Sequence, residues 1–299
     1  MSTIAQVKEI WRYPVKSMGG ERISTGFLSA KGLAGDRLWA VLDKDSEIKS
    51  ARQWPKLIQM KASFSSINEI NADTYAAAVP DIEISIPGHN AISSRTAETN
   101  NALTAFLGHE CHLEALRPAS DSAFYTPPND RDGSNLDVEL DKLDKLDDEG
   151  DFDFSETPEE MFDVLSRFMT PPGTFFDSLP LHILSTQIMA HLAAKSSADA
   201  DRRRFRPNIL LDFPESGSEI PEFELVGKRI RIGEAVIKIR AKTIRCSIPS
   251  RAQPLLELEH DPGMTRAMVK VFERHIGVYA NIEAEGAIEV GAPVELLHP

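Results

Sequence analysis

The sequence predicts an α+β fold dominated by β-strands, arranged as two lobes with a few packing helices. Apolar and polar residues alternate in strand-like runs in both halves of the chain, most clearly at 82–86 and 229–240. Helical patterns are fewer, and most of them are bounded by capping residues. An acidic run at about 130–163 separates the two halves. We therefore predict one domain at residues 1–116 and a second at 117–299, with the acidic run as an insertion in the second.

The first half is predicted to consist mostly of strands. A turn at 43–45 follows one strand, and Pro87 with Gly88 ends another. A short helix is predicted to begin at Thr99 and to end at Gly108. The predicted strands lie at 4–12, 38–42, 82–86 and 112–116.

The second half is predicted to contain three helices. The residues at 157–160 are typical of a helix start, and the pair at 185–186 can cap a second helix. The pair at 261–262 opens the last helix, whose apolar stripe runs through Ile276 to a cap at Gly277.

Strands separate these helices, and the clearest is a hairpin that turns at Gly233 and Glu234. Before it, Pro207 restricts the backbone of the preceding residue, so we expect Arg206 to be extended where the chain enters a buried strand. The predicted strands lie at 181–184, 209–211, 229–232 and 237–240, with two more around Gly291.

The charge of the chain is concentrated in one segment. Residues 130–163 contain 15 Asp or Glu and three Lys or Arg, a local balance of −12 out of −13 for the whole chain. The remainder is nearly neutral, which argues against a nucleic-acid-binding surface. The acidic run is therefore either a solvated loop or a docking site for a basic electron donor. No stretch approaches about 20 apolar residues, so we expect no membrane span and a cytoplasmic location.

Cys246 is the most informative single residue. It follows the hairpin in the run Lys-Thr-Ile-Arg-Cys at 242–246, and cations beside a thiol favour the thiolate. A thiolate here could attack a substrate or ligate a soft metal, although a strand end could also simply need a small apolar side chain. The other cysteine, Cys111, is too distant in sequence to indicate a disulfide framework. Two cysteines cannot hold an iron–sulfur cluster, so any electrons must come from a separate partner.

Three distant runs supply groups that bind anions. Lys16 and Ser17 follow the first predicted strand, and Arg37 stands in a Gly-Asp-Arg run before the second. Arg206 and Asn208 belong to an Arg-Phe-Arg-Pro-Asn run. Arginine offers a planar fork for phosphate, and asparagine offers both a donor and an acceptor. Each run alone could be a solvated turn, but together with the thiolate they suit a ligand with a soft metal at one end and a phosphate at the other.

Two other kinds of thiol site stay open. His109 and Cys111 would share one face of a strand, as in a zinc site, but no second ligand pair follows at a zinc spacing. A metal-free thiol hydrolase would need a histidine base that the sequence does not place. No Walker, G-x-S-x-G or G-x-G-x-x-G run occurs, so the corresponding nucleotide and hydrolase sites are not predicted.

These runs resemble landmarks of the MOSC-domain family with its N-terminal β-barrel domain, across essentially the whole chain. The landmarks of the first half are Tyr-Pro-Val-Lys-Ser at 13–17, Gly-Asp-Arg-Leu-Trp at 35–39 and Ala-Arg-Gln at 51–53. Those of the second half are Pro-Gly-Thr-Phe-Phe-Asp at 172–177, Leu-His-Ile-Leu-Ser-Thr at 181–186, Arg-Pro-Asn at 206–208, Thr-Ile-Arg-Cys at 243–246 and Gly-Val-Tyr-Ala at 277–280. The resemblance implies an N-terminal MOSC-type β-barrel lobe, followed by a MOSC β-barrel-like domain with packing helices.

The resemblance also implies a molybdenum cofactor. Cys246 would be the catalytic residue that ligates molybdenum, beside the dithiolene sulfurs of molybdopterin. Lys16, Ser17 and Arg37 match family positions that hold the cofactor from the N-terminal side. The matching positions on the other side are Ser185, Thr186, Arg206, Asn208, Arg245 and Tyr279.

The family includes amidoxime-reducing components and the C-terminal domain of molybdenum cofactor sulfurases. The resemblance therefore implies an oxidoreductase that reduces N-hydroxylated substrates, such as hydroxylamines or amidoximes, by two electrons from a separate reductase or electron carrier. The alternative is a non-catalytic carrier of the cofactor or of sulfur. MOSC domains also occur fused to pyridoxal-phosphate desulfurases, but we expect no such domain here because the two lobes account for the 299 residues. The segment 247–253 and the acidic insertion depart from the family pattern at the pocket rim, so the substrate stays open.

Overall fold

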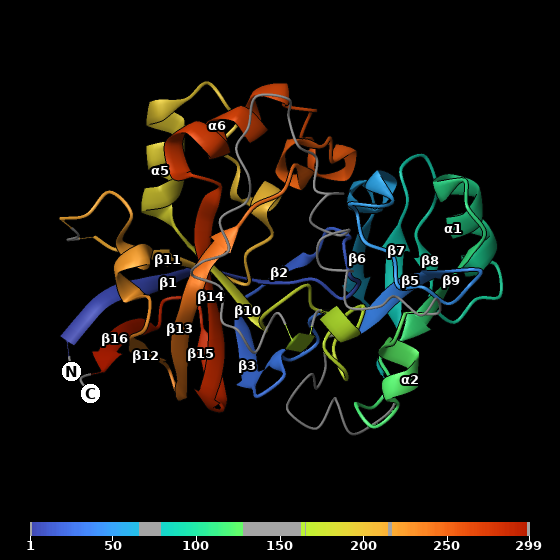
Figure 1. The fold of residues 1–299 in the computed structure, drawn as a ribbon, viewed down its shortest axis with the longest axis horizontal. Coiled ribbons are helices and arrows are strands. Elements are labelled where there is room, and N and C mark those ends of the chain that lie inside the picture. The colour runs from blue at the N-terminus through green and yellow to red at the C-terminus, as the bar shows by residue number, and fades with distance from the viewer. Residues whose placement is uncertain (1, 66–78, 128–162, 165, 215–216, 298–299) are drawn as a thin grey trace.

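The computed structural model describes residues 2–65, 79–127, 163–164, 166–214 and 217–297. Within these residues the chain forms a barrel lobe that carries two helices and a smaller lobe beside it (Figure 1). This arrangement confirms the predicted β-dominated α+β class. Nearly all of the acidic run, and the helix start predicted at 157–160, lie outside the described residues.

Seven strands close the barrel. Their order is β11-β10-β14-β13-β12-β16-β1, and a further pairing of β1 with β11 completes the circle. Strands β10 and β11 run parallel, whereas the other neighbours are antiparallel. The strands are β1 (Ser2–Arg12), β10 (Leu181–Ser185), β11 (Ile209–Asp212), β12 (Arg229–Ile232), β13 (Ala235–Ile244), β14 (His275–Ala284) and β16 (Pro293–Leu297), and β2 (Glu21–Ile23) pairs with the end of β1.

The first strand of the chain thus belongs to a barrel that is otherwise built from the second half. Strand β1 lies between β11 and β16, with Ile10 opposite Ile209 on one side and Ala5 opposite Val294 on the other. A second sheet also joins the two ends of the chain, and it contains β15 (Gly286–Glu289), β3 (Thr25–Ser29) and β4 (Gly32–Leu33). Strand pairing therefore crosses the predicted boundary between residues 116 and 117, and the division into 1–116 and 117–299 stays a prediction.

The barrel interior follows from the alternating pattern of its strands. In the predicted hairpin, Ile230, Ile232, Ile237 and Ile239 are fully buried in the main apolar core. The charged residues between them point to the other face of the sheet, because successive side chains of a strand alternate in direction. Burying each such isoleucine contributes about 2 kcal/mol to folding, so this pattern alone fixes which face is inside.

The described part of the smaller lobe contains two short sheets with α1 packed beside them. Strand β5 pairs with β9, and β6, β7 and β8 form a second sheet. The helix α1 ends at Gly108, as predicted, and this glycine has the left-handed φ of 82° that helix caps favour. The elements are β5 (Trp39–Asp43), β6 (Lys61–Phe64), β7 (Ile82–Ser85), β8 (Ile92–Ser93), β9 (Cys111–Ala115), α1 (Thr99–Leu107), α2 (Ser122–Tyr125) and η1 (Pro55–Gln59).

Two helices, α5 (Thr186–Lys195) and α6 (Pro262–Phe272), lie against each other on the barrel lobe (Figure 1). Ser185 caps α5 as predicted, since its side chain accepts a hydrogen bond from the Ile188 backbone. Asp261 caps α6 in the same way. Short 3₁₀ turns complete the lobe, and they are η3 (Arg202–Phe205), η4 (Pro221–Leu225), η5 (Ile248–Ser250) and η6 (Pro254–Leu256).

Two local predictions are wrong. Helix α6 ends at Phe272 and not at Gly277, because Glu273 takes a left-handed conformation and β14 begins at His275. Arg206 is not extended but left-handed, with φ 54° and ψ 53°, and it caps η3. The following proline mainly disfavours the right-handed helical region, so a left-handed turn remains available to Arg206.

Candidate functional site

Cys246 lies in the segment that leaves β13 and enters η5. Its thiol is free and only partly buried. The neighbouring Arg245 holds the segment in place, since its backbone donates to the Arg274 carbonyl at 2.8 Å and its Nη2 donates to the Phe205 carbonyl at 2.9 Å. Arg245 thus fastens the chain next to Cys246 to the residue before β14 and to the end of η3.

Two guanidinium groups from different lobes converge near this segment. The guanidinium carbons of Arg206 and Arg37 lie 4.8 Å and 5.5 Å from the centre of the same Tyr13 ring. Tyr13 is buried, its hydroxyl donates to the Pro207 carbonyl at 3.1 Å, and its backbone donates to the carboxylate of Asp36 at 2.7 Å. Burial raises the pKa of Tyr13, so its hydroxyl stays protonated and acts as a donor.

The charge of Arg206 is not neutralised by a direct partner. Within the described residues, its buried Nε and Nη2 atoms have no hydrogen-bond partner, and neither has Nε of Arg245. Burial, and then the nearby charge of Arg37, lower the pKa of Arg206 to about 10. Buried donors without acceptors cost free energy, so this arrangement suits an anion that accepts hydrogen bonds from both Arg206 and Arg245.

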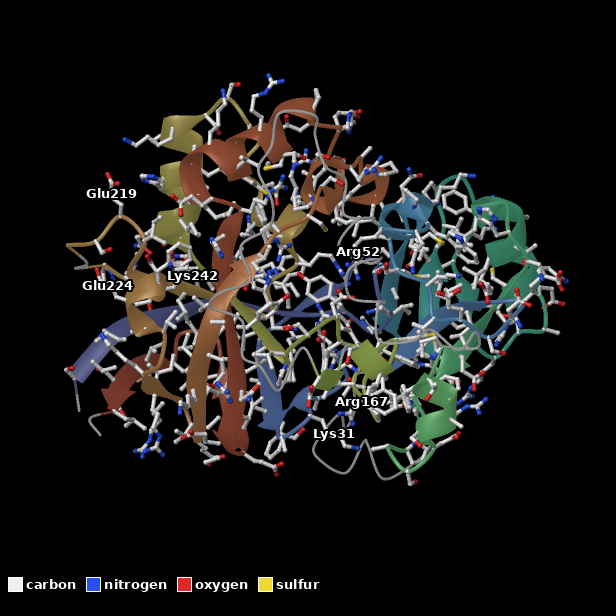
Figure 2. All side chains as sticks on the ribbon, viewed as in Figure 1. Lys31, Arg52, Arg167, Glu219, Glu224 and Lys242 are labelled. Atoms are coloured by element: carbon white, nitrogen blue, oxygen red, sulfur yellow. The ribbon has the colours of Figure 1, made fainter. Side chains whose placement is uncertain are left out.

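An ion pair between buried Lys16 and half-exposed Asp177 borders these arginines. Lys16 Nζ donates to Asp177 Oδ1 at 2.5 Å and to the Phe175 carbonyl at 3.1 Å. Burial lowers the pKa of Lys16, and Asp177 opposes that change. Although desolvation acts against it, Lys16 and then Arg52 hold the pKa of Asp177 well below its usual range. Arg52 lies in the middle of the molecule, between the two lobes (Figure 2).

Tyr279 connects these groups to the thiol. Burial raises its pKa, and its hydroxyl also interacts electrostatically with Arg245, Asp177, Arg37 and Cys246. On the neighbouring strand, His182 lies opposite Tyr279, with ring centres 5.8 Å apart. Burial, and then Arg245, keep the pKa of His182 well below its usual value, so this ring is neutral.

The structure therefore brings together six of the predicted site residues with three that were not predicted. We use the name Cys246 cluster for Cys246, Arg245, Tyr279, Arg206, Arg37 and Lys16, together with Tyr13, Asp177 and His182. Tyr13, Asp177 and His182 stand inside the landmark runs at 13–17, 172–177 and 181–186. Their aromatic, acidic and imidazole side chains, at those positions, are the sequence features that could have identified them as site residues.

Ser185 and Thr186 lie elsewhere and bind other groups. The Ser185 backbone and hydroxyl donate to the two carboxylate oxygens of buried Glu222 at 3.0 Å and 2.5 Å. The Thr186 hydroxyl donates to Asp212 Oδ1 at 2.8 Å. Both residues shape the start of α5, and no described contact joins them to the Cys246 cluster.

Ser17 and Asn208 hold the backbone around the cluster. The Ser17 hydroxyl accepts from the Ala51 backbone at 2.9 Å. The Asn208 side chain accepts from the His182 backbone at 3.2 Å and donates to the Trp11 carbonyl at 3.3 Å. Asn208 is fully buried, so it locks three barrel strands together and its amide is committed to them.

The other features of the sequence are not part of this cluster. Lys242, expected near the thiol, places its Nζ 5.4 Å from the ring centre of Phe223, in η4. His109 stacks on Trp54 with ring centres 4.8 Å apart, and buried Cys111 contacts Thr104. Among the described residues, no group of three His, Cys, Asp or Glu side chains is placed to hold a metal ion.

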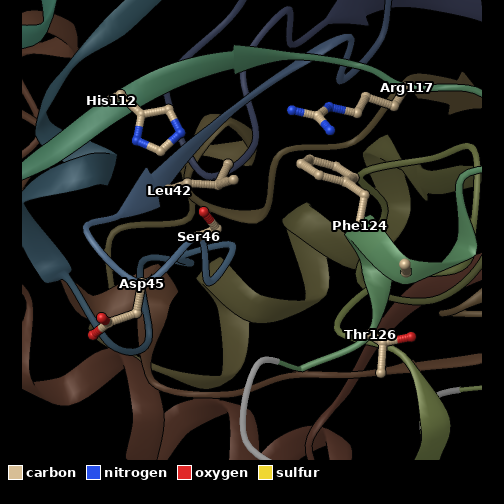
Figure 3. Close-up of a pocket in the computed structure, with 8 residues that line it drawn as sticks. Leu42, Asp45, Ser46, His112, Arg117, Phe124 and Thr126 are labelled. Carbon is tan, nitrogen blue, oxygen red and sulfur yellow. The ribbon is translucent and has the colours of Figure 1, made fainter.

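A separate cavity of about 260 Å³ lies between β5, β9 and α2, together with the turns that follow β5 and β9 (Figure 3). His112, Ser46 and Phe124 contribute to its lining. Arg117 also lines it, but this guanidinium is bound to Glu114 and Asp121 and lies over the Phe124 ring. No predicted site residue lines this cavity.

In the part of the chain that the structure describes, no helix combines the length and apolar character needed to span a membrane.

Comparison with known proteins supplies the context for this cluster. A family model described as the MOSC N-terminal beta barrel domain matches residues 4–123, and one described as the MOSC domain matches residues 171–295. Human mitochondrial amidoxime reducing component 2 is 24% identical over 312 residues, covering 98% of this chain and 84% of that protein. Human mitochondrial amidoxime-reducing component 1 is also 24% identical, over 316 residues, covering 99% of this chain and 84% of its own length.

Solved structures show weaker likeness. The YUAD protein from Bacillus subtilis has a TM-score of 0.44 at 10% identity, covering 98% of this chain and 94% of its own. YiiM from Geobacillus stearothermophilus has a TM-score of 0.31 at 19% identity, covering 40% and 55% of the two chains. The two family models, in the order in which the landmark runs predict them, show that the chain belongs to the MOSC-domain family.

Proposed function

We propose that the Cys246 cluster binds a molybdenum cofactor and that the chain is an oxidoreductase. Its substrates would be N-hydroxylated compounds such as hydroxylamines or amidoximes, reduced by two electrons from a separate reductase or electron carrier. The observation that carries the proposal is the convergence of Arg37 and Arg206 on Tyr13, in one cluster with a partly exposed thiol. Membership of the MOSC family supports a role associated with the molybdenum cofactor, and the names of the relatives support the substrate class.

The residues of the cluster fit such a cofactor chemically. The unpartnered guanidinium nitrogens of Arg206 and Arg245 need an anionic acceptor, which a phosphate supplies. A thiolate suits a soft or high-valent metal, and Cys246 is the free, partly exposed thiol of this region. When bound, the molybdenum centre would supply the two-electron chemistry. Arg37, Arg206 and Arg245 would bind and orient the cofactor, and Tyr279 would offer a protonated hydroxyl near the sulfur.

The proposal assigns a different part to the other predicted residues. Ser17 and Asn208 support the cluster through the backbone groups that they bind. Ser185 and Thr186 stand outside it, since Glu222 and Asp212 occupy their hydroxyls. We propose a cytoplasmic location as well, which fractionation of the source cells would test.

Elemental analysis tests the proposal directly. The protein should be purified from a host that makes molybdopterin, beside the variants Cys246→Ala and Cys111→Ala. The wild type and Cys111→Ala should contain close to one molybdenum per chain, and Cys246→Ala should contain far less. Equal molybdenum in Cys246→Ala would refute the ligand assignment.

Turnover separates the enzyme from a carrier of the cofactor or of sulfur. Loaded protein, given a competent reductase and a hydroxylamine or amidoxime, should perform many turnovers per molybdenum. A carrier would bind the cofactor yet reduce none of these compounds.

A further inference from the structure

Arg204 is fully buried, and four groups bind its guanidinium. Its Nε and Nη2 donate to Asp199 Oδ2 at 3.1 Å and 2.7 Å. Its Nη1 donates to the carbonyls of Pro249 and Arg251 at 3.2 Å and 3.3 Å. Nη2 also donates to the Glu259 carbonyl at 2.8 Å. The side chain is only 1% exposed, so these contacts replace its hydration completely.

All three carbonyls belong to the segment that follows Cys246. Residues 247–261 contain the short turns η5 and η6 and an isolated β-bridge between Gln253 and Leu258, and the described hydrogen bonds that their backbone N–H groups donate stay within the segment. At its start, Ile248 packs against the core of the smaller lobe. At its end, the Asp261 backbone donates to the Ser250 carbonyl at 2.8 Å. Arg204 therefore ties this segment to the barrel lobe through three of its carbonyls.

The two residues after Arg204 act on the same region. The Phe205 carbonyl accepts from Arg245, next to the thiol, and Arg206 reaches Tyr13 in the cluster. Three consecutive residues thus act around Cys246. Arg204 binds the segment after it, Phe205 binds the residue before it, and Arg206 is part of the Cys246 cluster.

We propose that Arg204 is a positioning residue, which fixes the segment around Cys246 and so the direction in which the sulfur faces the cluster. A planar fork that donates to one carboxylate and three carbonyls in fixed directions is a contact that lysine cannot reproduce. The role of the sulfur as a ligand rests on the proposed function, but the effect of Arg204 on the sulfur does not.

The variant Arg204→Lys isolates the fork from the charge. It keeps a cation beside Asp199 but cannot serve the three carbonyls together. Arg203→Lys is the matched control, because Arg203 is the preceding residue and its guanidinium is bound to Asp201, outside the segment.

The first measurement uses cofactor-free protein and needs no molybdenum. The rate of Cys246 alkylation by iodoacetamide, followed by peptide-resolved mass spectrometry, reports how the thiol is presented. Arg204→Lys should change this rate by about threefold or more, since thiol reactivity depends on its surroundings, whereas Arg203→Lys should match the wild type. The alkylation of buried Cys111 serves as an internal measure of global opening and should not change.

The second measurement uses loaded protein. Arg204→Lys should alter the electron paramagnetic resonance signal of the partly reduced metal and lose cofactor faster on dialysis, and Arg203→Lys should do neither. An unchanged alkylation rate together with an unchanged signal in Arg204→Lys would overturn the proposal. If Arg204→Lys does not fold, Asp199→Asn loosens the same guanidinium and is judged by the same two measurements. An altered alkylation rate in a protein that never binds molybdenum would support Arg204 while refuting the proposed function.

Discussion

The guanidinium carbon of Arg206 lies 4.8 Å from the centre of the Tyr13 ring, and the Tyr13 hydroxyl donates to the carbonyl of the residue after Arg206. Tyr13 follows the first strand, whereas Arg206 comes almost 200 residues later, so this contact fastens the start of the chain to the cationic side of the cluster. The guanidinium carbon of Arg37 lies 5.5 Å from the same ring centre, so the Tyr13 ring contacts both cationic groups.

Removing the Tyr13 ring should weaken cofactor binding more than removing its hydroxyl. Tyr13→Leu deletes the surface on which two guanidinium groups rest, so we expect about 10- to 100-fold faster loss of cofactor. Tyr13→Phe keeps the ring and loses one hydrogen bond, for which about fivefold is expected. Molybdenum content after timed dialysis measures both. Equal losses in the two variants would show that the ring itself contributes nothing.

Replacing Arg206 should stabilise the cofactor-free protein while it impairs binding. Burial and Arg37 lower the pKa of Arg206 to about 10, so the side chain is still charged at pH 8 and its charge costs free energy in the folded state. Arg206→Gln removes that charge, and because the side chain is partly solvated we expect a gain on the order of 1 kcal/mol at pH 8. Urea unfolding of cofactor-free protein measures the free energy. A clear loss of stability would contradict the idea that an anion completes this site.

The carboxylate of Asp177 should stabilise the fold through Lys16. Asp177→Asn leaves the buried ammonium without its charged partner, but the carboxylate is half exposed and solvent screens the pair, so we expect a loss on the order of 1 kcal/mol at pH 7. Because the folded pKa of Asp177 is depressed, its contribution is present above the unfolded pKa and is lost as pH falls through the folded one. The difference between variant and wild type should therefore shrink under strong acid. Asp45→Asn is the control, since its pair with Lys44 is exposed and its loss should not register.

Glu222 should give the stability of the protein an opposite pH dependence. Burial raises the pKa of Glu222 to about 7 from a usual 4.5, so the folded state binds its proton more tightly than the unfolded state. This contribution is fully present below the unfolded pKa and declines as pH rises to about 7, by about 3 kcal/mol at most. Glu222→Gln should remove that decline. Urea unfolding at pH 5 and pH 8 measures it, and an equal change with pH in both proteins would show that Glu222 does not titrate in this range.

Gly277 should tolerate no side chain. It has φ 84°, and a Cβ there would lie 2.5 Å from His182 Nε2 and 2.6 Å from the Ile183 carbonyl oxygen. Gly108 has nearly the same φ of 82°, but a Cβ there meets nothing within 4 Å. Gly108→Ala should cost about 1 kcal/mol, and Gly277→Ala about 2–4 kcal/mol more, because two strands must also move apart. Similar melting temperatures for the two variants would mean that the collision is relieved at little cost.

Local signals explain which elements the sequence could predict. The β12–β13 hairpin and helix α1 carry their own information, in alternating isoleucines and in a glycine at the helix end. The end of α6 has no such local signal. Glu273 and Arg274 both take left-handed conformations, which glutamate and arginine do not usually indicate. The apolar pattern continues through Ile276 because that residue is buried in a strand as fully as it would be in a helix.

The site was predictable only as a set of residue types. Charged residues beside a cysteine indicated an anion and a metal, and Arg37, Arg206 and Lys16 do lie in the cluster. Ser185 and Thr186 have the same polar character, yet their partners Glu222 and Asp212 stand 37 and 26 positions away. Such distant pairings are not visible in local spacing, and they decide whether a hydroxyl is available to a ligand.

Strand β1 has a consequence for how the protein must be made. A ribosome releases residues 2–12 long before their two neighbours in the sheet, residues 209–212 and 293–297. Strand β1 must therefore wait until residue 297 has left the ribosome before both of its edges are covered. A fragment that begins after residue 12 would leave β11 and β16 exposed to other chains, so excising the second lobe at a conventional boundary should yield material prone to aggregate.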